Sequence, residues 1–163
     1  MPRVYVGIGS NIDPGKNVRQ GIRALQERFG NLIISPVYES EPVGCTGDNF
    51  YNLVAGFDSH ETCEAVAAAL YDIEAGFGRS RAHARLLPRA LDLDLLLYGD
   101  QVIETENFRL PRQDILDYAF VLKPLADVAG DQVHPVAGRS YGDLWSSFNH
   151  PGQKLWRIEL DGD

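Results

Sequence analysis

The sequence Arg89-Ala90-Leu91-Asp92-Leu93-Asp94-Leu95-Leu96-Leu97 marks the clearest strand of the chain, which we predict over residues 90–98. Residues two apart in a strand point to the same face, so the four leucines at odd positions are expected to face the core together. Asp92 and Asp94 are expected to share the opposite face, with their Cα atoms roughly 6.5–7 Å apart. The strand therefore has one apolar face for the core and one face that carries two carboxylates.

Further strands are predicted on both sides of this one. Alternating apolar residues predict a first strand at residues 4–8, and two more strand-like stretches follow before the aspartates. Residues 100–104 are expected to pair with the strand at 90–98, and a last strand closes the chain. The additional predicted strands cover residues 32–41, 51–58 and 155–160.

Helices are predicted between these strands from their caps and apolar stripes. Asp13 and Pro14 are placed to begin a first helix, which Gly30 ends. Ser59 is expected to cap a second helix, which Gly78 closes. Two later helices are predicted near residues 115–128 and 141–148.

The predicted elements follow the order strand-helix-strand-strand-helix-strand. This is the split-βαβ or ferredoxin-like arrangement, an antiparallel sheet with two helices on one face. The later segments are expected to add a helical layer on the other face. We therefore predict an α/β (α+β) fold with a ferredoxin-like βαββαβ core, additional helices and a three-layer αβα sandwich. The length of the chain predicts a single domain over residues 1–163.

Composition and charge exclude several classes of protein. The 163 residues are 44% hydrophobic and 23% charged, and no run of about 18 apolar residues predicts a membrane span. The formal net charge of −8 makes binding to a nucleic-acid backbone unfavourable. The first residues show no signal-peptide pattern, and Cys45 and Cys63 lack zinc or redox spacing. We interpret both cysteines as free thiols and expect a cytoplasmic location.

A basic stretch precedes the two aspartates. No acidic residue occurs between Glu74 and Asp92, and the interval contains Arg79, Arg81, Arg85 and Arg89. Residues 79–89 are predicted to form an exposed loop. Arginine suits phosphate because its planar guanidinium donates two parallel hydrogen bonds and stays charged. The alternative interpretation is a solvated basic loop without a ligand.

The aspartate pair also has two interpretations. Two carboxylates at this spacing repel each other, and a pair of Mg²⁺ ions roughly 3.5–4 Å apart would offset the repulsion, as in two-metal phosphoryl-transfer sites. The alternative is a strand whose polar face is solvated. Because the basic stretch directly precedes the pair, we favour a site for magnesium and a phosphate-bearing substrate.

Phe50, Tyr51 and Asn52 combine aromatic surface with an amide that can read the donor and acceptor edges of a flat heterocycle. The plain alternative is the start of a strand with core aromatics. The acidic pair alone is also compatible with a nucleotidyl or glycosyl transferase that acts on another metal-bound diphosphate. The choice between these activities needs more than single motifs.

An ordered set of motifs resembles the 6-hydroxymethyl-7,8-dihydropterin pyrophosphokinase family over nearly the whole chain. The most specific motif is Pro88-Arg89-Ala90-Leu91-Asp92-Leu93-Asp94. The other matching motifs are Val6-Gly-Ile-Gly-Ser-Asn11, Val37-Tyr-Glu-Ser-Glu-Pro-Val-Gly44, Phe50-Tyr-Asn52, Ile73-Glu74, Gly78-Arg79-x-Arg81, Leu110-Pro111 and Phe120-Val-Leu-x-Pro-Leu125. The resemblance implies an α/β fold with a ferredoxin-like core. It also implies transfer of pyrophosphate from ATP to the hydroxymethyl group of the pterin, with release of AMP.

The resemblance also implies roles for individual residues. Asp92 and Asp94 would bind two Mg²⁺ ions and, with Arg79 and Arg89, form the catalytic set. ATP would be the co-substrate, and a neighbouring enzyme of the folate pathway is a possible partner. The implied pterin-binding residues are Ser40, Val43, Gly44, Phe50, Asn52 and Phe120. The implied nucleotide-binding residues are Glu74, Arg79, Arg81, Arg89 and Arg112.

The chain departs from the family pattern on the nucleotide side. Arg112-Gln113 stands where the family usually has His-Tyr, and Tyr118 stands where it usually has an arginine. Leu86-Leu87 replaces Trp-Gly, and Tyr71 stands where a glutamine is common. We therefore expect an intact metal pair and pterin site beside altered nucleotide contacts. The alternatives are a divergent paralogue with weak or altered nucleotide use, and a pterin-binding module without turnover.

Overall fold

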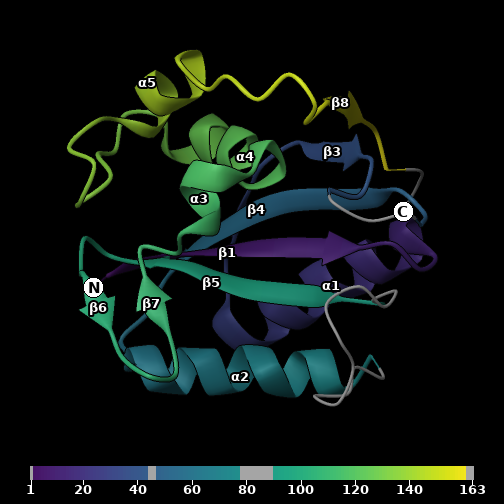
Figure 1. Ribbon diagram of the computed structural model, residues 1–163. Helices are drawn as coiled ribbons and strands as arrows, with labels where there is room; N and C mark the ends of the chain where they lie inside the picture. The colour runs from purple at the N-terminus through teal and green to yellow at the C-terminus, as the bar shows by residue number, and fades with distance from the viewer. Residues whose placement is uncertain (1, 44–46, 78–89, 161–163) are drawn as a thin grey trace.

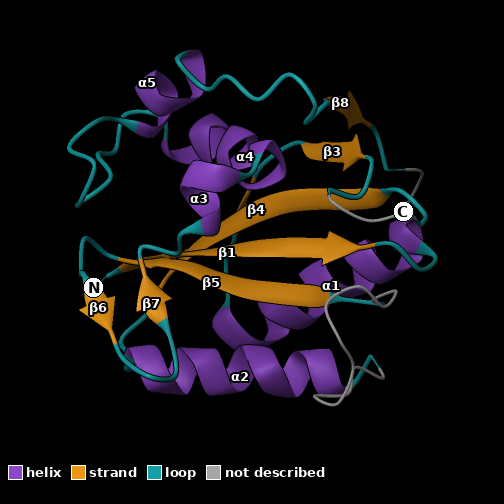
Figure 2. Cartoon of the chain, viewed as in Figure 1, coloured by secondary structure: helices purple, strands orange, loops and turns teal. Residues whose placement is uncertain are grey.

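A computed structural model describes residues 2–43, 47–77 and 90–160 of the chain. The chain contains both helices and strands, as Figures 1 and 2 show. In chain order they are β1 Arg3–Ser10, α1 Pro14–Phe29, β2 Ile33–Ile34, β3 Val37–Ser40, β4 Phe50–Asp58, α2 Cys63–Ala75, β5 Asp92–Tyr98, β6 Ile103–Glu104, β7 Arg109–Leu110, α3 Asp114–Asp117, α4 Ala119–Ala129, α5 Tyr141–Ser146 and β8 Leu155–Ile158.

The main sheet is antiparallel and has helices on both faces. Its strands follow the order β5-β1-β4-β3-β8, and β2 also pairs with β4. Helices α1 and α2 pack on one face, against β1, β4 and β5. Helix α4 packs on the other face, against β3 and β4, and α3 and α5 pack on α4. The predicted α+β class, ferredoxin-like core and three layers are therefore confirmed.

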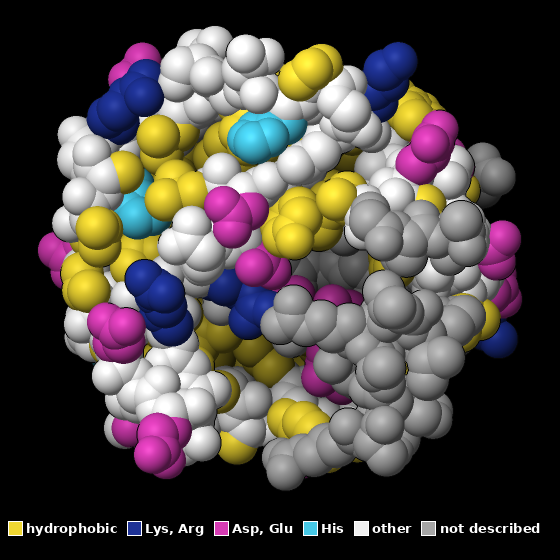
Figure 3. Space-filling model, viewed as in Figure 1, with side chains coloured by type: hydrophobic (Ala, Val, Ile, Leu, Met, Phe, Trp, Pro, Cys, Tyr) yellow, Lys and Arg dark blue, Asp and Glu magenta, His cyan; other side chains and the backbone are white. Residues whose placement is uncertain are grey.

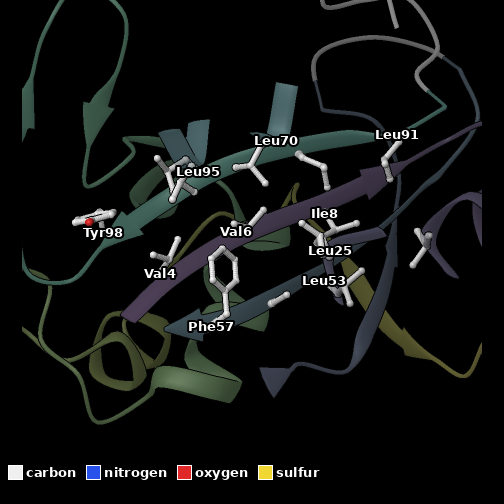
Figure 4. Close-up of a cluster of buried hydrophobic side chains, with 14 of the residues drawn as sticks. Val4, Val6, Ile8, Leu25, Leu53, Phe57, Leu70, Leu91, Leu95 and Tyr98 are labelled. Carbon is white, nitrogen blue, oxygen red and sulfur yellow. The ribbon is translucent and has the colours of Figure 1, made fainter. Parts of the chain in front are cut away.

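Two apolar layers hold the sheet to these helices. The larger layer lies under α1 and α2, and the stick view in Figure 4 shows Val4, Val6 and Ile8 of β1 pointing into it. The second layer lies under α4 and α5 and includes Tyr5 and Val54. Alternation along β1 supplies both layers, because consecutive side chains point to opposite faces. Among the described residues, no helix has the length and apolar character needed to cross a membrane.

A β-bulge in β5 changes which face its last leucines occupy. Val6 pairs with Leu95 but Tyr5 pairs with Leu97, so Leu96 is an extra residue in β5. Leu91, Leu93 and Leu95 enter the layer under α1 and α2, whereas Leu97 enters the other layer. The prediction that all four odd-numbered leucines share one face is therefore wrong for Leu97. The bulge shifts the alternation by one residue.

The cap of the second helix also differs from the prediction. The Thr62 hydroxyl accepts a hydrogen bond from the Ala65 N–H at 3.1 Å and caps α2, whereas the Ser59 hydroxyl accepts from the Glu61 N–H at 3.0 Å in the preceding turn. Helix α2 ends at Ala75, and Gly78 lies outside the described residues. The first helix begins after Asp13 as predicted. However, Asp13 adopts a left-handed conformation, with φ 39°, and makes no side-chain cap bond.

Several predicted elements are subdivided. The stretch 32–41 forms two short strands, β2 and β3, and the stretch 115–128 forms α3 and α4. Tyr118 separates these helices because its backbone is extended, with φ −128° and ψ 127°. The predicted pairing of 100–104 with 90–98 is wrong: β6 pairs with β7 instead. The predicted short helix near 141–148 and the last strand are confirmed as α5 and β8.

Candidate active site

A row of residues crosses the sheet on the face that α4 packs against. Asp92 of β5 lies opposite Gly9 of β1, Gly9 lies opposite Asn52 of β4, and Asn52 lies opposite Tyr38 of β3. Asp94 lies one step along this face, opposite Gly7. The antiparallel register thus brings an acidic pair and a carboxamide from distant parts of the sequence to one surface.

Gly9 is required where it stands because Asn52 covers it. A Cβ atom at Gly9 would lie 2.6 Å from Oδ1 of Asn52, which is closer than a carbon and an oxygen can approach. The same atom at Gly7 would only touch the Leu96 side chain, at 3.7 Å. The Asn52 amide therefore lies across β1, on the same row as Asp92.

The electrostatics of the acidic pair favour a cation. Burial and, to a smaller extent, the negative charge of Asp92 raise the pKa of Asp94 to about 7, although the positive charge of Arg112 opposes the rise. The Asp94 side chain keeps 32% of its surface exposed, so an incoming ion can reach it. Ionised Asp94 is thus unfavourable without positive charge nearby.

The donor set fits Mg²⁺ that is shared with phosphates. Carboxylate oxygens are the ligands that this hard cation prefers, and it commonly takes one or two of them together with substrate phosphates and water. Within the described ranges, no group of three or more His, Cys, Asp or Glu side chains is placed to hold a metal ion. Asp92 and Asp94 suit a cation that also takes oxygen ligands from phosphate and water.

Arg112 lies beside this pair. One terminal guanidinium nitrogen is 3.7 Å from Oδ1 of Asp94, and Nε donates to Oδ2 of Asp114 at 3.2 Å. Burial alone would lower the pKa of Arg112, but the charges of Asp94 and Asp114 more than offset this, and the pKa is raised. Its guanidinium stays charged and keeps 34% of its surface exposed. Figure 3 shows acidic and basic side chains meeting at a hollow in this face.

Glu74 fixes the backbone of β5, the strand that carries Asp92 and Asp94. This residue of α2 is only 6% exposed, and its carboxylate accepts a hydrogen bond of 2.6 Å from the Leu93 N–H. Leu93 stands between Asp92 and Asp94, so Glu74 anchors the backbone that carries both. At the bulge itself, the Arg112 N–H donates to the Leu96 carbonyl at 3.0 Å.

Three of the residues implied for pterin binding, Ser40, Phe50 and Asn52, lie on the same face of the sheet. Phe50 pairs with Ser40 across β4 and β3, two residues from the pairing of Asn52 with Tyr38. Ser40 is buried, while Val43 is 43% exposed. Phe120 lies at the start of α4, and its ring stacks on that of Tyr118 with centroids 5.1 Å apart. Because α4 packs on β4, this stacked pair lies at the start of the helix that covers the face of Phe50 and Asn52.

Four implied residues fall outside the described residues. They are Gly44, Arg79, Arg81 and Arg89. Sequence reasoning missed Asp114, which binds Arg112, and Gly9, which Asn52 covers. The sequence did contain a signal for Asp114, because it is an acidic residue two positions after Arg112. No signal within β1 could have identified the role of Gly9, because that role depends on how β1 and β4 are paired.

Comparison with known proteins supplies a family. The sequence matches the family described as 7,8-dihydro-6-hydroxymethylpterin-pyrophosphokinase (HPPK) over residues 5–130. It is 38% identical over 138 residues to the 2-amino-4-hydroxy-6-hydroxymethyldihydropteridine pyrophosphokinase of Pseudomonas aeruginosa, covering 80% of this chain and 83% of that relative. The protein of the same name from Methylorubrum extorquens is 34% identical over 163 residues, covering 98% of this chain and 100% of the relative.

Some relatives are much longer than this chain. The folic acid synthesis protein fol1 of Pneumocystis carinii is 34% identical over 150 residues, which cover 89% of this chain but 20% of that protein. A Plasmodium falciparum HPPK-DHPS structure with SDX-DHP has a TM-score of 0.67 at 14% identity, covering 90% of this chain and 43% of that one. A structure of HPPK-DHPS in complex with substrates gives a TM-score of 0.71 at 11% identity, with the same two coverages. At these identities the solved structures support the fold alone.

Proposed function

The chain belongs to the 7,8-dihydro-6-hydroxymethylpterin-pyrophosphokinase family, and we propose that Asp92 and Asp94 form the centre of its reaction. It is an ATP-dependent diphosphokinase of folate biosynthesis. The hydroxymethyl oxygen of 6-hydroxymethyl-7,8-dihydropterin attacks the β-phosphorus of ATP. The bond from this phosphorus to the α-phosphate oxygen breaks, AMP leaves with that oxygen, and the hydroxyl proton is released.

The observation that carries the proposed centre is the position of two carboxylates on one strand face. Burial and the negative charge of Asp92 disfavour the charged form of Asp94, whose pKa is raised. We propose that the two side chains hold two Mg²⁺ ions. When bound, Mg²⁺ would neutralise phosphate charge and align the transferred group with the acceptor hydroxyl. Glu74 keeps the two carboxylates in place through its bond to the backbone between them.

The pterin is proposed to bind beside this centre, over the same face of the sheet. Phe50 and Phe120 would hold the ring between them, and Asn52 would read its edge with the donor and acceptor of one amide. Ser40, Val43 and Gly44 would complete this pocket. The register supports the arrangement because Asn52 and Asp92 lie on either side of Gly9 in one row. The acceptor hydroxyl would then lie near the carboxylates.

Arginines are proposed to neutralise the phosphates of ATP. The roles of Arg79, Arg81 and Arg89 rest on the family motifs, and that of Arg112 also rests on its position beside Asp94. Charge on the transferred group is compensated in the transition state, so these side chains would act mainly on the rate. Glu74 would contribute on the nucleotide side through the strand it anchors.

Location and partners are proposals as well. We propose a cytoplasmic enzyme that acts as one domain. The cytoplasmic location is supported by Cys63, a buried free thiol whose pKa is raised by burial, because free thiols persist in a reducing compartment. Relatives described as folic acid synthesis proteins are much longer than this chain, which covers 20% of one and 21% of another. They support a neighbouring folate-pathway enzyme as a partner. This association is tested by immobilising the chain and measuring whether folate-pathway enzymes from the same cell bind to it.

The proposed function is tested by nucleotide analysis. The chain is incubated with ATP, Mg²⁺ and 6-hydroxymethyl-7,8-dihydropterin, and AMP is quantified with and without the pterin. AMP that appears only with the pterin supports the proposal. Pterin binding without AMP would favour a pterin-binding module, and AMP without pterin dependence would favour another transferase.

A further inference from the structure

The guanidinium of Arg112 is shared unequally between two carboxylates. Its Nε is within hydrogen-bond distance of Asp114, at 3.2 Å, whereas its terminal nitrogen is 3.7 Å from Asp94. At the second distance, Arg112 and Asp94 form an ion pair without a short hydrogen bond. Asp114 therefore holds the head group, and Asp94 interacts with it mainly through charge.

The backbone of Arg112 is tied to the strand that carries Asp94. Its N–H donates to the Leu96 carbonyl at 3.0 Å, and its carbonyl accepts from the Ile115 N–H at 3.2 Å. These bonds leave the side chain as the part of Arg112 that can move. With Asp114 as a fixed partner, a small rotation of the guanidinium can break the contact with Asp94 and keep the other.

The charges at this place predict competition. Asp92, Asp94 and Asp114 raise the pKa of Arg112, so its positive charge already compensates part of their negative charge. A divalent cation at Asp94 would meet this positive charge a few ångströms away. Phosphates that arrive with the cation would instead attract the guanidinium, whose planar fork matches them.

We propose that Arg112 is an internal counter-ion that weakens divalent-cation binding at Asp94 until a nucleotide is present. In the nucleotide-free chain its guanidinium stabilises Asp94 and opposes the cation. When nucleotide binds, the guanidinium turns to the phosphates while Asp114 retains it. Cation and nucleotide binding are therefore positively coupled through Arg112, and each increases the affinity of the other. This inference rests on the proposed metal site and adds a positioning role to it.

Binding of Mn²⁺ alone to the nucleotide-free protein gives the first test. Electron paramagnetic resonance of free Mn²⁺ yields the dissociation constant without any turnover. We expect Arg112→Gln to lower this constant roughly five- to tenfold, since a repelling charge is removed. Arg112→Lys keeps the charge and should stay within about twofold of the wild type. Arg109→Gln is the matched control, because it removes an equal charge from an exposed position on β7.

The second test measures the coupling. The affinity for α,β-methylene-ATP is determined with and without Mg²⁺ for the wild type and for Arg112→Gln. We expect Mg²⁺ to strengthen nucleotide binding in both, but by a factor roughly fivefold smaller in the variant. Equal Mn²⁺ constants for Arg112→Gln and Arg109→Gln, or equal coupling factors, would overturn the inference.

Asp94→Asn separates this inference from the proposed function. If Asp94→Asn weakens Mn²⁺ binding, the metal site stands, and the Arg112 variants decide the inference independently. If Asp94→Asn binds Mn²⁺ as the wild type does, or if no protein binds Mn²⁺ alone, the inference fails. Formation of AMP still tests the proposed function in either case.

Discussion

Oδ1 of Asn52 lies where a methyl group on Gly9 would come within 2.6 Å of it. This close approach puts the Asn52 amide over β1 and toward Asp92, the next residue in the row. The Asn52 amide, which we propose binds the pterin, thus lies over a residue that has no side chain. It could not keep its position if Gly9 carried one.

Gly9→Ala should therefore weaken pterin use. The added methyl group forces the Asn52 amide to move, and a displaced hydrogen-bonding group loses about 1–3 kcal/mol. We expect the KM for the pterin to rise roughly tenfold or more, with a smaller change in the KM for ATP. Gly7→Ala is the control, because its methyl group would meet Leu96 at an ordinary 3.7 Å. Similar KM values for both variants would contradict the placement of Asn52 in the pterin site.

Replacing either aspartate should abolish transfer without removing the pterin. Asp92→Asn and Asp94→Asn remove a negative ligand at nearly constant shape, so we expect AMP formation to fall roughly 10³-fold or more. Pterin affinity, measured by fluorescence titration, should change by less than about threefold. Asp100→Asn, in the exposed turn after β5, should leave both quantities unchanged. Near-normal AMP formation in Asp92→Asn would remove these carboxylates from the centre.

Loss of Glu74 should affect stability as well as rate. Glu74→Ala leaves the Leu93 N–H without its acceptor, and a buried unpaired donor costs about 1–3 kcal/mol. Urea unfolding monitored by circular dichroism should show a decrease of that size in the free energy of unfolding. Asp72→Ala, on an exposed part of the same helix, should change it by less than about 0.5 kcal/mol. If the two variants are equally stable, the bond to Leu93 is not an anchor.

The pKa of Asp94 predicts a pH dependence of the ligand-free protein. Its pKa is raised to about 7 in the folded chain, above the value of about 3.9 for an unfolded chain. Between these values the folded state binds more protons, so stability falls as pH rises from about 4 to about 7. Because 32% of the side chain is exposed, solvent limits the effect to about 1–2 kcal/mol.

Asp94→Asn should remove this component of the pH dependence and stabilise the ligand-free chain at pH 8. Thermal unfolding at a series of pH values, without divalent cations, measures the difference between variant and wild type. The difference should grow between pH 4 and pH 7 and level off above it. A difference that is constant with pH would show that Asp94 titrates normally.

Prediction from sequence worked where a pattern lies within one element. The alternation along β1 and β5 predicted both strands and placed Asp92 and Asp94 on one face, and the resemblance pointed to Arg112. Failures arose where a contact between elements decides the outcome. The bulge before Leu97 depends on pairing with β1. The extended backbone at Tyr118 interrupts the helical pattern of 115–128, whereas the proline of that stretch, Pro124, lies inside α4. The relationships of Arg112 with Asp94 and of Asn52 with Gly9 likewise exist only after folding.

The bonds that Glu74 and Arg112 make to β5 also have a consequence for solubility. Strand β5 is an edge strand of the main sheet. The unpaired backbone groups of an edge strand can pair with another chain and start an aggregate. The Leu93 N–H is taken by Glu74 and the Leu96 carbonyl by Arg112, so two groups that would recruit an incoming strand are already satisfied. Selection on Glu74 can therefore reflect protection against intermolecular pairing in addition to chemistry. The bond to the Leu96 carbonyl comes from the backbone N–H of residue 112, so every residue except proline can make it. Loss of the Glu74 carboxylate alone would leave the Leu93 N–H open to an incoming strand.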